Sequence, residues 1–419
     1  MQSRAPLFLL FPAMTRARPV RPIPILFEDS GASLLTPLAD LRPTFDIIVG
    51  ALTLREKYEH YLGLRITRTI VRDYLRDSEY LALGSLPISG VVLLLNARAV
   101  CDASFAAAIK AMPVNSVLMK GATVVAALCT VDLRTTVDDL NEQLPAIAAL
   151  QVTQSDVPMI DRPWDVVRDF SVALRSDVGV IARRSKRGAT SLRGVHVLKP
   201  KALFKANSSR TYPGVVINAE AGPVIICAGA QIMPNAYIEG PCVIRPHAVV
   251  KPHASISNAT IGMHCRIGGE IHTSTFHAYV NKQHEGFAGH SYFAPWVNLG
   301  AGTITSNLKN TYGNIRTVFD GKSADTGMQF LGTIAGDHAK FGINTMLNTG
   351  TIVGVGGNVV GAGFPDKSIP PFQWDANGKR YSFEKFLTIA RAVMARRDKH
   401  LTPHNEALLR VVYDRTSPS

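Results

Sequence analysis

The chain has 419 residues, of which 46% are hydrophobic and 18% are charged. A chain of this length is too long for one ordinary hydrophobic core, so more than one domain is expected. The composition is typical of a globular protein, which excludes a largely disordered chain. The formal net charge of +13 comes from scattered basic residues without a DNA- or RNA-binding motif, so we expect phosphorylated small molecules rather than nucleic acid as partners. No apolar run approaches the roughly 20 residues that span a bilayer, and we expect a soluble protein.

Residues 1–21 are expected to lie outside the folded domains. A short apolar stretch from Leu7 to Phe11 lacks the charged beginning and the cleavage site of a signal peptide. We interpret the segment as a disordered extension, or as the product of a start codon assigned too early, with Met14 as the true start. The five cysteines form no CxxC pair, so reduced thiols and a cytoplasmic location are expected.

Residues 22–210 alternate between apolar strands and helical segments. Strands are expected at 25–27 and 91–95, and a helix is expected at 53–62. Strands separated by helices predict a layered α/β domain.

Residues 211–365 carry a six-residue repeat. Branched aliphatic residues stand at Ile226, Ile232, Ile238, Ile244, Val250 and Ile256, and small residues stand four positions later in each unit. A period of six matches neither the helical 3.6 nor the strand 2.0. It predicts a left-handed parallel β-helix with three flat sides, in which the aliphatic residue fills the interior and the small residue lets the corner close.

The repeat slips by one residue at Ile261, resumes at Ile267 and returns later at Phe341, Leu347, Val353 and Val359. We interpret the stretch from about 274 to 288 as a loop thrown out of a continuous solenoid. Loops of this kind usually carry the chemistry.

Residues 366–419 are expected to form a tail with one amphipathic helix from Phe383 to Arg397, packed over the last coil or a neighbour.

Two segments of the repeat region resemble a known family. Gly289-His290-Ser291-Tyr292 and residues 297–307 resemble the acetyltransferase domain of bifunctional N-acetylglucosamine-1-phosphate uridyltransferases. A family of sugar nucleotidyltransferase-like proteins shares further short patterns, such as Asn281-Lys282 and Leu308-Lys309-Asn310. The resemblance covers about a third of the chain and implies a β-helix acyltransferase behind a Rossmann-like nucleotidyltransferase domain.

The resemblance implies a general base at His290, which would take a proton from a sugar amine as the amine attacks acetyl-CoA or another acyl-CoA. Imidazole suits this role because it titrates near neutrality. The alternative is a loop histidine without a role.

The resemblance also implies two sets of binding residues. The acceptor sugar and its phosphate would contact Lys282, Tyr292, Asn298, Asn307 and Lys309. Coenzyme A would contact Ala301, Ile343 and Gly361. The chain departs from the uridyltransferases in two ways: it is one hexad shorter between His290 and Asn298, and Ile343 replaces a small polar residue. Solvated lysines are the alternative reading of Lys282 and Lys309.

Hexapeptide β-helices also carry zinc in one class of carbonic anhydrase. His272 and His277 have the separation used there, and further histidines lie on neighbouring coils. A third ligand at the required spacing is absent, so we expect no metal and assign these histidines to solvated corners.

The front domain resembles the nucleotidyltransferase half of the same enzymes but departs from its catalytic pattern. Residues 27–31, Phe-Glu-Asp-Ser-Gly, replace the phosphate-binding glycine-rich loop, and Asn96-Ala97-Arg98 replaces a magnesium-binding Asp. Two readings stay open: phosphate contacts by Arg42, Arg55 and Lys57 with a metal at Asp29, or a structural domain that has lost catalysis. Magnesium is expected only in the first case, and we expect weak or absent nucleotidyl transfer.

The leading interpretation is CoA-dependent N-acyl transfer to an amino sugar phosphate or a nucleotide sugar, by a homotrimer with active sites between β-helices. Two alternatives remain: a sugar-1-phosphate nucleotidyltransferase that uses the β-helix only to form the trimer, and a non-catalytic sugar-nucleotide-binding protein.

Overall fold

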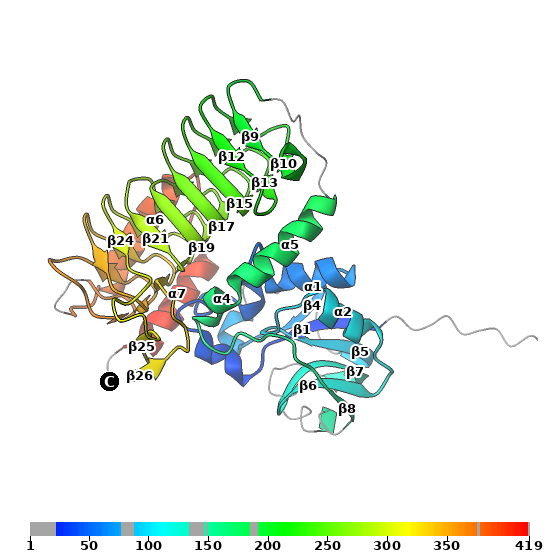
Figure 1. Ribbon diagram of the computed structural model, residues 1–419. Coiled ribbons are helices and arrows are strands. Elements are labelled where there is room, and N and C mark those ends of the chain that lie inside the picture. The colour runs from blue at the N-terminus through cyan, green and yellow to red at the C-terminus, as the bar shows by residue number, and fades with distance from the viewer. Residues whose placement is uncertain are drawn as a thin grey trace, which may run out of the picture.

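The chain folds into a front α/β domain, a parallel β-helix and two C-terminal helices (Figure 1). The computed structural model describes residues 22–76, 88–133, 146–147, 150–184, 192–374 and 378–417. The predicted extension, residues 1–21, lies outside these ranges. Within them, none of the helices is long and apolar enough to cross a membrane.

The front domain contains a six-stranded mixed sheet in the order β4-β1-β5-β7-β6-β8. Its strands are β1 (Ile23–Phe27), β4 (Arg68–Ile70), β5 (Ile88–Asn96), β6 (Ser116–Lys120), β7 (Thr123–Leu133) and β8 (Gln151–Gln154). Its helices are α1 (Leu54–Leu62), α2 (Ala103–Lys110), α4 (Asp165–Arg168) and α5 (Phe170–Arg184). The predicted α/β class is confirmed, and α1 begins at a capping box formed by Thr53 and Glu56.

The β-helix has three sides, which we call side one, side two and side three in the order of the chain. Side one contains β9 (His196–Leu198), β12 (Val216–Asn218), β21 (Phe287–Gly289), β24 (Ile304–Thr305) and β29 (Met346–Leu347). Side two contains β10 (Leu203–Lys205), β13 (Val224–Ile226), β22 (Tyr292–Phe293), β27 (Thr333–Ala335), β30 (Thr351–Val353) and β32 (Ser368–Ile369). Three long strands bend from side one to side two: β15 (Tyr237–Ile244), β17 (Ser255–Met263) and β19 (Glu270–Ala278).

Side three is an eight-stranded parallel sheet. Its strands are β11 (Arg210–Thr211), β14 (Gln231–Ile232), β16 (Val249–Val250), β18 (Arg266–Ile267), β20 (Asn281–Lys282), β23 (Asn298–Leu299), β28 (Lys340–Phe341) and β31 (Asn358–Val359). The six-residue spacing therefore predicts the coil correctly. The aliphatic side chains of the repeat form one buried cluster along the axis.

The structure corrects the predicted start of this region. The parallel ladder begins at His196 rather than at 211, because β9 and β11 pair with β12 and β14. The pattern did not reveal the first coil because Lys205 and Thr211, which pair in register with Ile226 and Ile232, are not aliphatic.

The loop predicted at 274–288 is wrong. Strands β19, β20 and β21 pair in regular register there, and the coil is uninterrupted. The excursion lies instead at 306–332, between β24 and β27, and contains a hairpin of β25 (Arg316–Phe319) and β26 (Lys322–Asp325).

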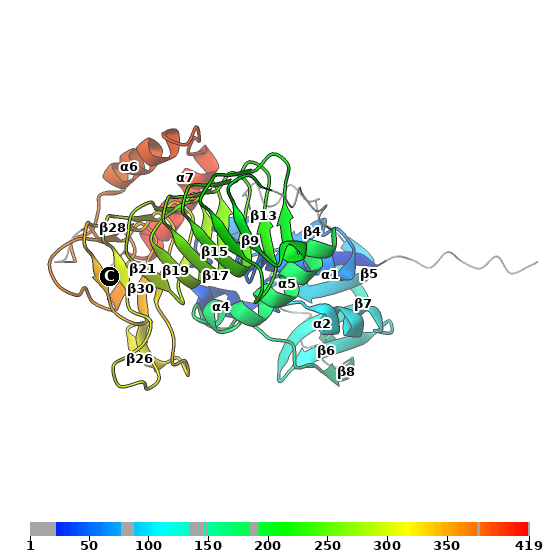
Figure 2. The same cartoon turned by 45° about the horizontal axis from the view of Figure 1, so that its top comes forward.

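Two other parts of the chain cover sides two and three. Helix α5 packs Phe170, Leu174 and Val178 on the outward residues Ile225 and Val243 of side two. Helix α6 (Phe383–Ala395) lies over side three, and the unpredicted helix α7 (Pro403–Arg415) lies next to it (Figure 2). The contacts described for α5 and α6 are with sides two and three, and not with side one.

The six-residue pattern is not visible at Lys282, because this polar residue occupies an inward position of the coil. It pairs in register with Ile267. Its side chain is 1% exposed, and Nζ donates to the carbonyl oxygens of His284 and Glu285 at 3.1 Å each. Burial lowers the pKa of this lysine to about 8, with Glu285 opposing the shift. The ammonium therefore faces the interior of the coil, where an acceptor phosphate does not reach.

We expect Lys282→Met to change the pH dependence of stability. The folded-state pKa of Lys282 lies below the unfolded value, so the penalty of the buried charge is full below pH 8 and disappears as the pH rises towards 10.5. The free energy of unfolding of the variant, relative to wild type, should fall by about 3 kcal/mol across that window. Urea denaturation at several pH values checks this, with exposed Lys322→Met as a control whose difference stays flat. Parallel curves for Lys282→Met and wild type would contradict the buried charge.

Candidate functional site

His290 lies at the corner between sides one and two, directly after β21. Its backbone has a φ of 47°, in the left-handed region. The preceding Gly289 has no room for a side chain, because a Cβ would lie 2.3 Å from the Phe287 ring and 2.7 Å from Nδ2 of Asn307. The short strand and its glycine therefore fix the histidine ring at this corner.

The two ends of the excursion at 306–332 close over the His290 ring. Nδ2 of Asn307, at its start, lies 2.8 Å from Nδ1 of His290, and the Phe330 ring, near its end, stacks at 5.0 Å. The backbone completes the closure, since Gly332 N–H donates to the His290 carbonyl oxygen. Sequence reasoning named His290 as a base and Asn307 as an acceptor-sugar contact, but it did not predict their hydrogen bond and did not find Phe330.

Burial lowers the pKa of His290 to about 4, and the nearby His272 adds to the shift. The imidazole is therefore neutral at physiological pH, which is the state that a base needs. The Asn307 amide donates to Nδ1 in this orientation, so the ring proton lies on Nε2. A half-turn of the amide would place its oxygen at Nδ1–H and leave Nε2 free to accept a proton.

The other predicted acceptor residues do not gather around His290. The Tyr292 hydroxyl accepts a hydrogen bond from Ile48 N–H at 3.2 Å, so this fully buried ring joins the β-helix to the front domain. Asn298 faces outward on side three, hydrogen-bonded to Asn281 at 2.8 Å. Lys309 lies in the excursion, where Nζ donates to the Asn314 carbonyl oxygen at 3.1 Å.

The three predicted coenzyme A residues lie on successive coils at the corner between sides three and one. Ala301 is followed by Ile343, which is 76% exposed, and then by Gly361, whose φ is 132°. Side one thus has His290 at one edge and this row at the other, with the half-exposed Ile304 and Met346 between them.

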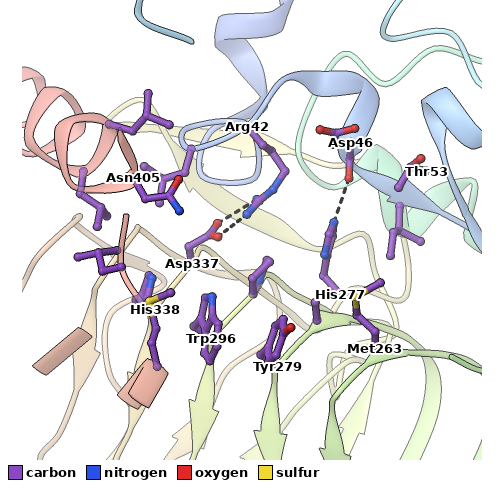
Figure 3. A pocket seen from close by; sticks show the side chains of 18 of the residues that line it. Arg42, Asp46, Thr53, Met263, His277, Tyr279, Trp296, Asp337, His338 and Asn405 are labelled. Atoms are coloured by element: carbon purple, nitrogen blue, oxygen red, sulfur yellow. Dashed lines mark hydrogen bonds and ion pairs between the residues drawn. The ribbon is translucent and has the colours of Figure 1, made fainter. Parts of the chain in front are cut away.

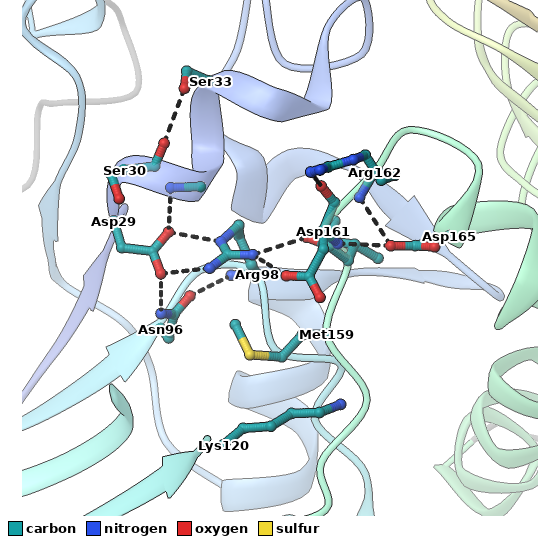
Figure 4. Close-up of polar contacts among 12 residues, drawn as sticks. Asp29, Ser30, Ser33, Asn96, Arg98, Lys120, Met159, Asp161, Arg162 and Asp165 are labelled. Atoms are coloured by element: carbon teal, nitrogen blue, oxygen red, sulfur yellow. Dashed lines mark hydrogen bonds and ion pairs between the residues drawn. The ribbon is translucent and has the colours of Figure 1, made fainter. Parts of the chain in front are cut away.

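In the front domain an arginine neutralises Asp29, the carboxylate that would hold a metal in one of the two readings left open by the sequence (Figure 4). Arg98 donates from Nε and Nη2 to the two carboxylate oxygens of Asp29, at 2.6 Å each, and pairs with Asp161 on its other side. The Asn96 amide also donates to Asp29, at 2.8 Å. Because a guanidinium is permanently charged and fills this space, the residues present do not fit a magnesium ion.

The predicted phosphate-binding residues of the front domain make contacts with other protein groups. Lys57 is 1% exposed and donates to both carboxylate oxygens of Asp177 at 2.6 Å. Arg42 pairs with Asp337 of the β-helix, and Arg55 packs over the Phe45 ring at 4.4 Å. These placements give Lys57 and Arg42 structural roles and do not support phosphate binding by them.

A cavity of about 500 Å³ lies between the front domain, the β-helix and the C-terminal helices (Figure 3). The Arg42–Asp337 pair crosses it, and Nε2 of His277 lies 2.9 Å from the Asp46 carbonyl oxygen. No sequence signal pointed to this cavity, because its walls come from distant segments.

An aromatic ladder runs along the corner between sides two and three. Successive rings stack nearly parallel, with centroids 4.2–6.2 Å apart: His247, His264, Tyr279, Trp296 and His338. Each of these residues has a left-handed φ. His247 and His264, two of the histidines weighed as zinc ligands, thus stack in this ladder. Among the residues that the structure describes, no group of three or more His, Cys, Asp or Glu is arranged for a metal ion.

Comparisons with known proteins give the relationships of the chain. Residues 24–186 match the family model of the sugar nucleotidyl transferases. The "Bifunctional protein GlmU" of Prochlorococcus marinus (strain MIT 9211) is 27% identical over 215 residues, which cover 45% of this chain and 44% of that protein. The protein of the same name from Rippkaea orientalis (strain PCC 8801 / RF-1) is 30% identical over 174 residues, which cover 41% of this chain and 34% of that protein. The chain thus spans less than half the length of these relatives.

Among solved structures, a hexapeptide transferase family protein from Anaplasma phagocytophilum matches 52% of this chain and 99% of that chain. The identity is 15% and the TM-score is 0.27, so the fold assignment depends on the strand register above. The front domain is thus similar to the sugar nucleotidyl transferases, and the chain is similar in sequence to the bifunctional GlmU proteins.

Proposed function

We propose that the protein is an acyltransferase whose β-helix transfers an acyl group from coenzyme A to the amine of a sugar phosphate or nucleotide sugar. The observation that carries the proposal is the neutral imidazole of His290, held by Asn307 and covered by Phe330 at one edge of side one. Resemblance to the acetyltransferase half of the bifunctional enzymes supplies the reaction class.

In the proposed reaction the Asn307 amide is turned so that its oxygen accepts from Nδ1–H, and Nε2 of His290 takes a proton from the acceptor amine as the amine nitrogen attacks the thioester carbonyl. The carbon–sulfur bond of the resulting tetrahedral intermediate then breaks, and the departing thiolate recovers the proton. Asn307 holds the imidazole through Nδ1, and Phe330 keeps water from one face of the ring. The protein gains and loses no net proton in the cycle.

We expect His290→Asn to lower kcat by about a hundredfold or more, because a positioned base contributes roughly 10² to 10⁴. Asparagine tolerates the left-handed φ at this corner, so the melting temperature should stay close to wild type. The wild-type rate should fall only as the pH drops towards 4, where the imidazole becomes protonated.

The assay is thiol release from acetyl-CoA with amino sugar phosphates and nucleotide amino sugars as acceptors. His253→Asn is the matched control, since His253 is an exposed corner histidine with a similar φ of 60°. An unchanged rate in His290→Asn would refute the role of this base.

The proposed active site needs two copies of the chain. Because His290 and the row of Ala301, Ile343 and Gly361 lie at opposite edges of side one, a neighbouring copy can bring its row to the His290 edge. The half-exposed apolar residues Ile304 and Met346 between the edges suit such a contact. Three copies close the arrangement as a homotrimer.

Light scattering at micromolar concentration should give the mass of three chains, and Ile304→Glu with Met346→Glu should shift the mass towards one chain with loss of acyl transfer. A monomeric wild-type protein would contradict the shared site.

A second candidate function is nucleotidyl transfer, favoured by the family match of residues 24–186. The Arg98–Asp29 pair argues against it, because the carboxylate that would bind the metal is already neutralised. We therefore expect no pyrophosphate release above background when the protein is given magnesium, a sugar-1-phosphate and each of the four nucleoside triphosphates. A coupled pyrophosphate assay checks this, and robust release would reverse the assignment of the front domain.

A further inference from the structure

A row of outward-facing side chains on side three has a basic residue at each end. Arg266, Asn281, Asn298 and Lys340 are consecutive partners in the parallel register of β18, β20, β23 and β28. Neighbouring strands lie about 4.8 Å apart, so the two ends of the row are roughly 14 Å apart. The row therefore presents two amides between two cations.

The end of α6 turns this row into a cavity of about 240 Å³. Arg396 and Arg397 follow the last helical turn and line the cavity opposite the strands. Four of the residues that line the cavity are cationic, namely Arg266, Lys340, Arg396 and Arg397, and none of the lining residues is acidic.

The hydrogen bonds found in the cavity do not neutralise its charge. Arg397 donates from Nη1 to the His264 carbonyl oxygen at 3.1 Å, and Nη2 lies 3.5 Å from the Asn281 amide oxygen. Lys340 donates from Nζ to the His338 carbonyl oxygen at 3.0 Å. All of these acceptors are uncharged, so the cations repel one another until an anion enters.

Burial adds to the cost of this arrangement. It lowers the pKa of Lys340 to about 8, and it lowers the pKa of Arg397, an effect to which the nearby Arg266 and Arg396 add. A bound anion would remove both the repulsion and the desolvation cost, which makes its binding favourable.

We infer that this cavity is a binding site for a diphosphate-bearing small molecule. Cations spread over the length of the row suit two linked phosphate groups better than one, and the volume is below the roughly 300–1,000 Å³ of sites that enclose a whole ligand. Tyr279 and Trp296 line both this cavity and the 500 Å³ cavity on the other side of the ladder, which offers space to the organic part of a nucleoside diphosphate. The site lies on side three, away from His290, and does not depend on the proposed acyl transfer.

The test is titration calorimetry of the full chain with inorganic phosphate, pyrophosphate and UDP, in potassium chloride at matched ionic strength. We expect wild type to bind pyrophosphate and UDP at least about tenfold more tightly than phosphate. The double variant Arg266→Gln, Arg396→Gln should weaken both by tenfold or more, which corresponds to about 1.4 kcal/mol or more. Both side chains are at least partly exposed, and neither lies in the coil interior.

The matched control is Arg210→Gln, because Arg210 occupies the same outward row of side three on β11, beyond the cavity. It should bind pyrophosphate as wild type does. Three results would overturn the inference: no binding of pyrophosphate or UDP by wild type, undiminished binding by the double variant, or an equal loss in the control, which would show attraction to net charge alone. The thiol-release assay on the double variant separates this site from the proposed acyl transfer.

Discussion

The interior of a three-sided coil is narrow and accepts an aliphatic side chain and a small one from each side in every turn, and the rest of this structure depends on that constraint. Aliphatic residues at six-residue intervals meet it along most of the axis. Once the interior is filled, each corner is fixed in space and adopts a left-handed backbone that His, Asn, Gly and Trp occupy here. Corner residues therefore point outward at regular intervals. This spacing sets the positions of His290, of the aromatic ladder and of the predicted coenzyme A row.

The periodic pattern predicted the β-helix because it reports burial inside one coil, where the partners lie a fixed number of residues apart. It missed the first coil, where Lys205 and Thr211 stand at the positions of the aliphatic residues, and it mistook the region of an inward lysine for a loop. The resemblance named His290 and Asn307 separately, and the structure brings them together because the two residues are one turn of the coil apart at one corner. Sequence spacing thus carries information about neighbours along the axis.

The contacts that spacing did not predict join segments with no common period. The Tyr292 hydroxyl accepts a hydrogen bond from Ile48. Arg42 forms an ion pair with Asp337, and Arg98 forms one with Asp29. In each case a residue type that suggested ligand binding serves a structural contact. Charged and aromatic residues are ambiguous in this way, because the same hydrogen-bonding capacity serves a substrate or a neighbouring domain. The basic cavity under α6 escaped prediction because two of its arginines come from a helix that follows the repeat.

The front domain and the β-helix share one apolar cluster, to which Tyr292, Ala294, Ile334 and Ile352 of the solenoid contribute beside Leu26, Leu95 and Phe105 of the front sheet and its helix. Separating the halves would expose these side chains to water together with the orphaned charge of Arg42 or Asp337. Neither half is therefore an autonomous folding unit, although the front half matches a family model of its own. A gene fusion that exchanged either half for a foreign relative would have to recreate this shared surface as well as the two folds.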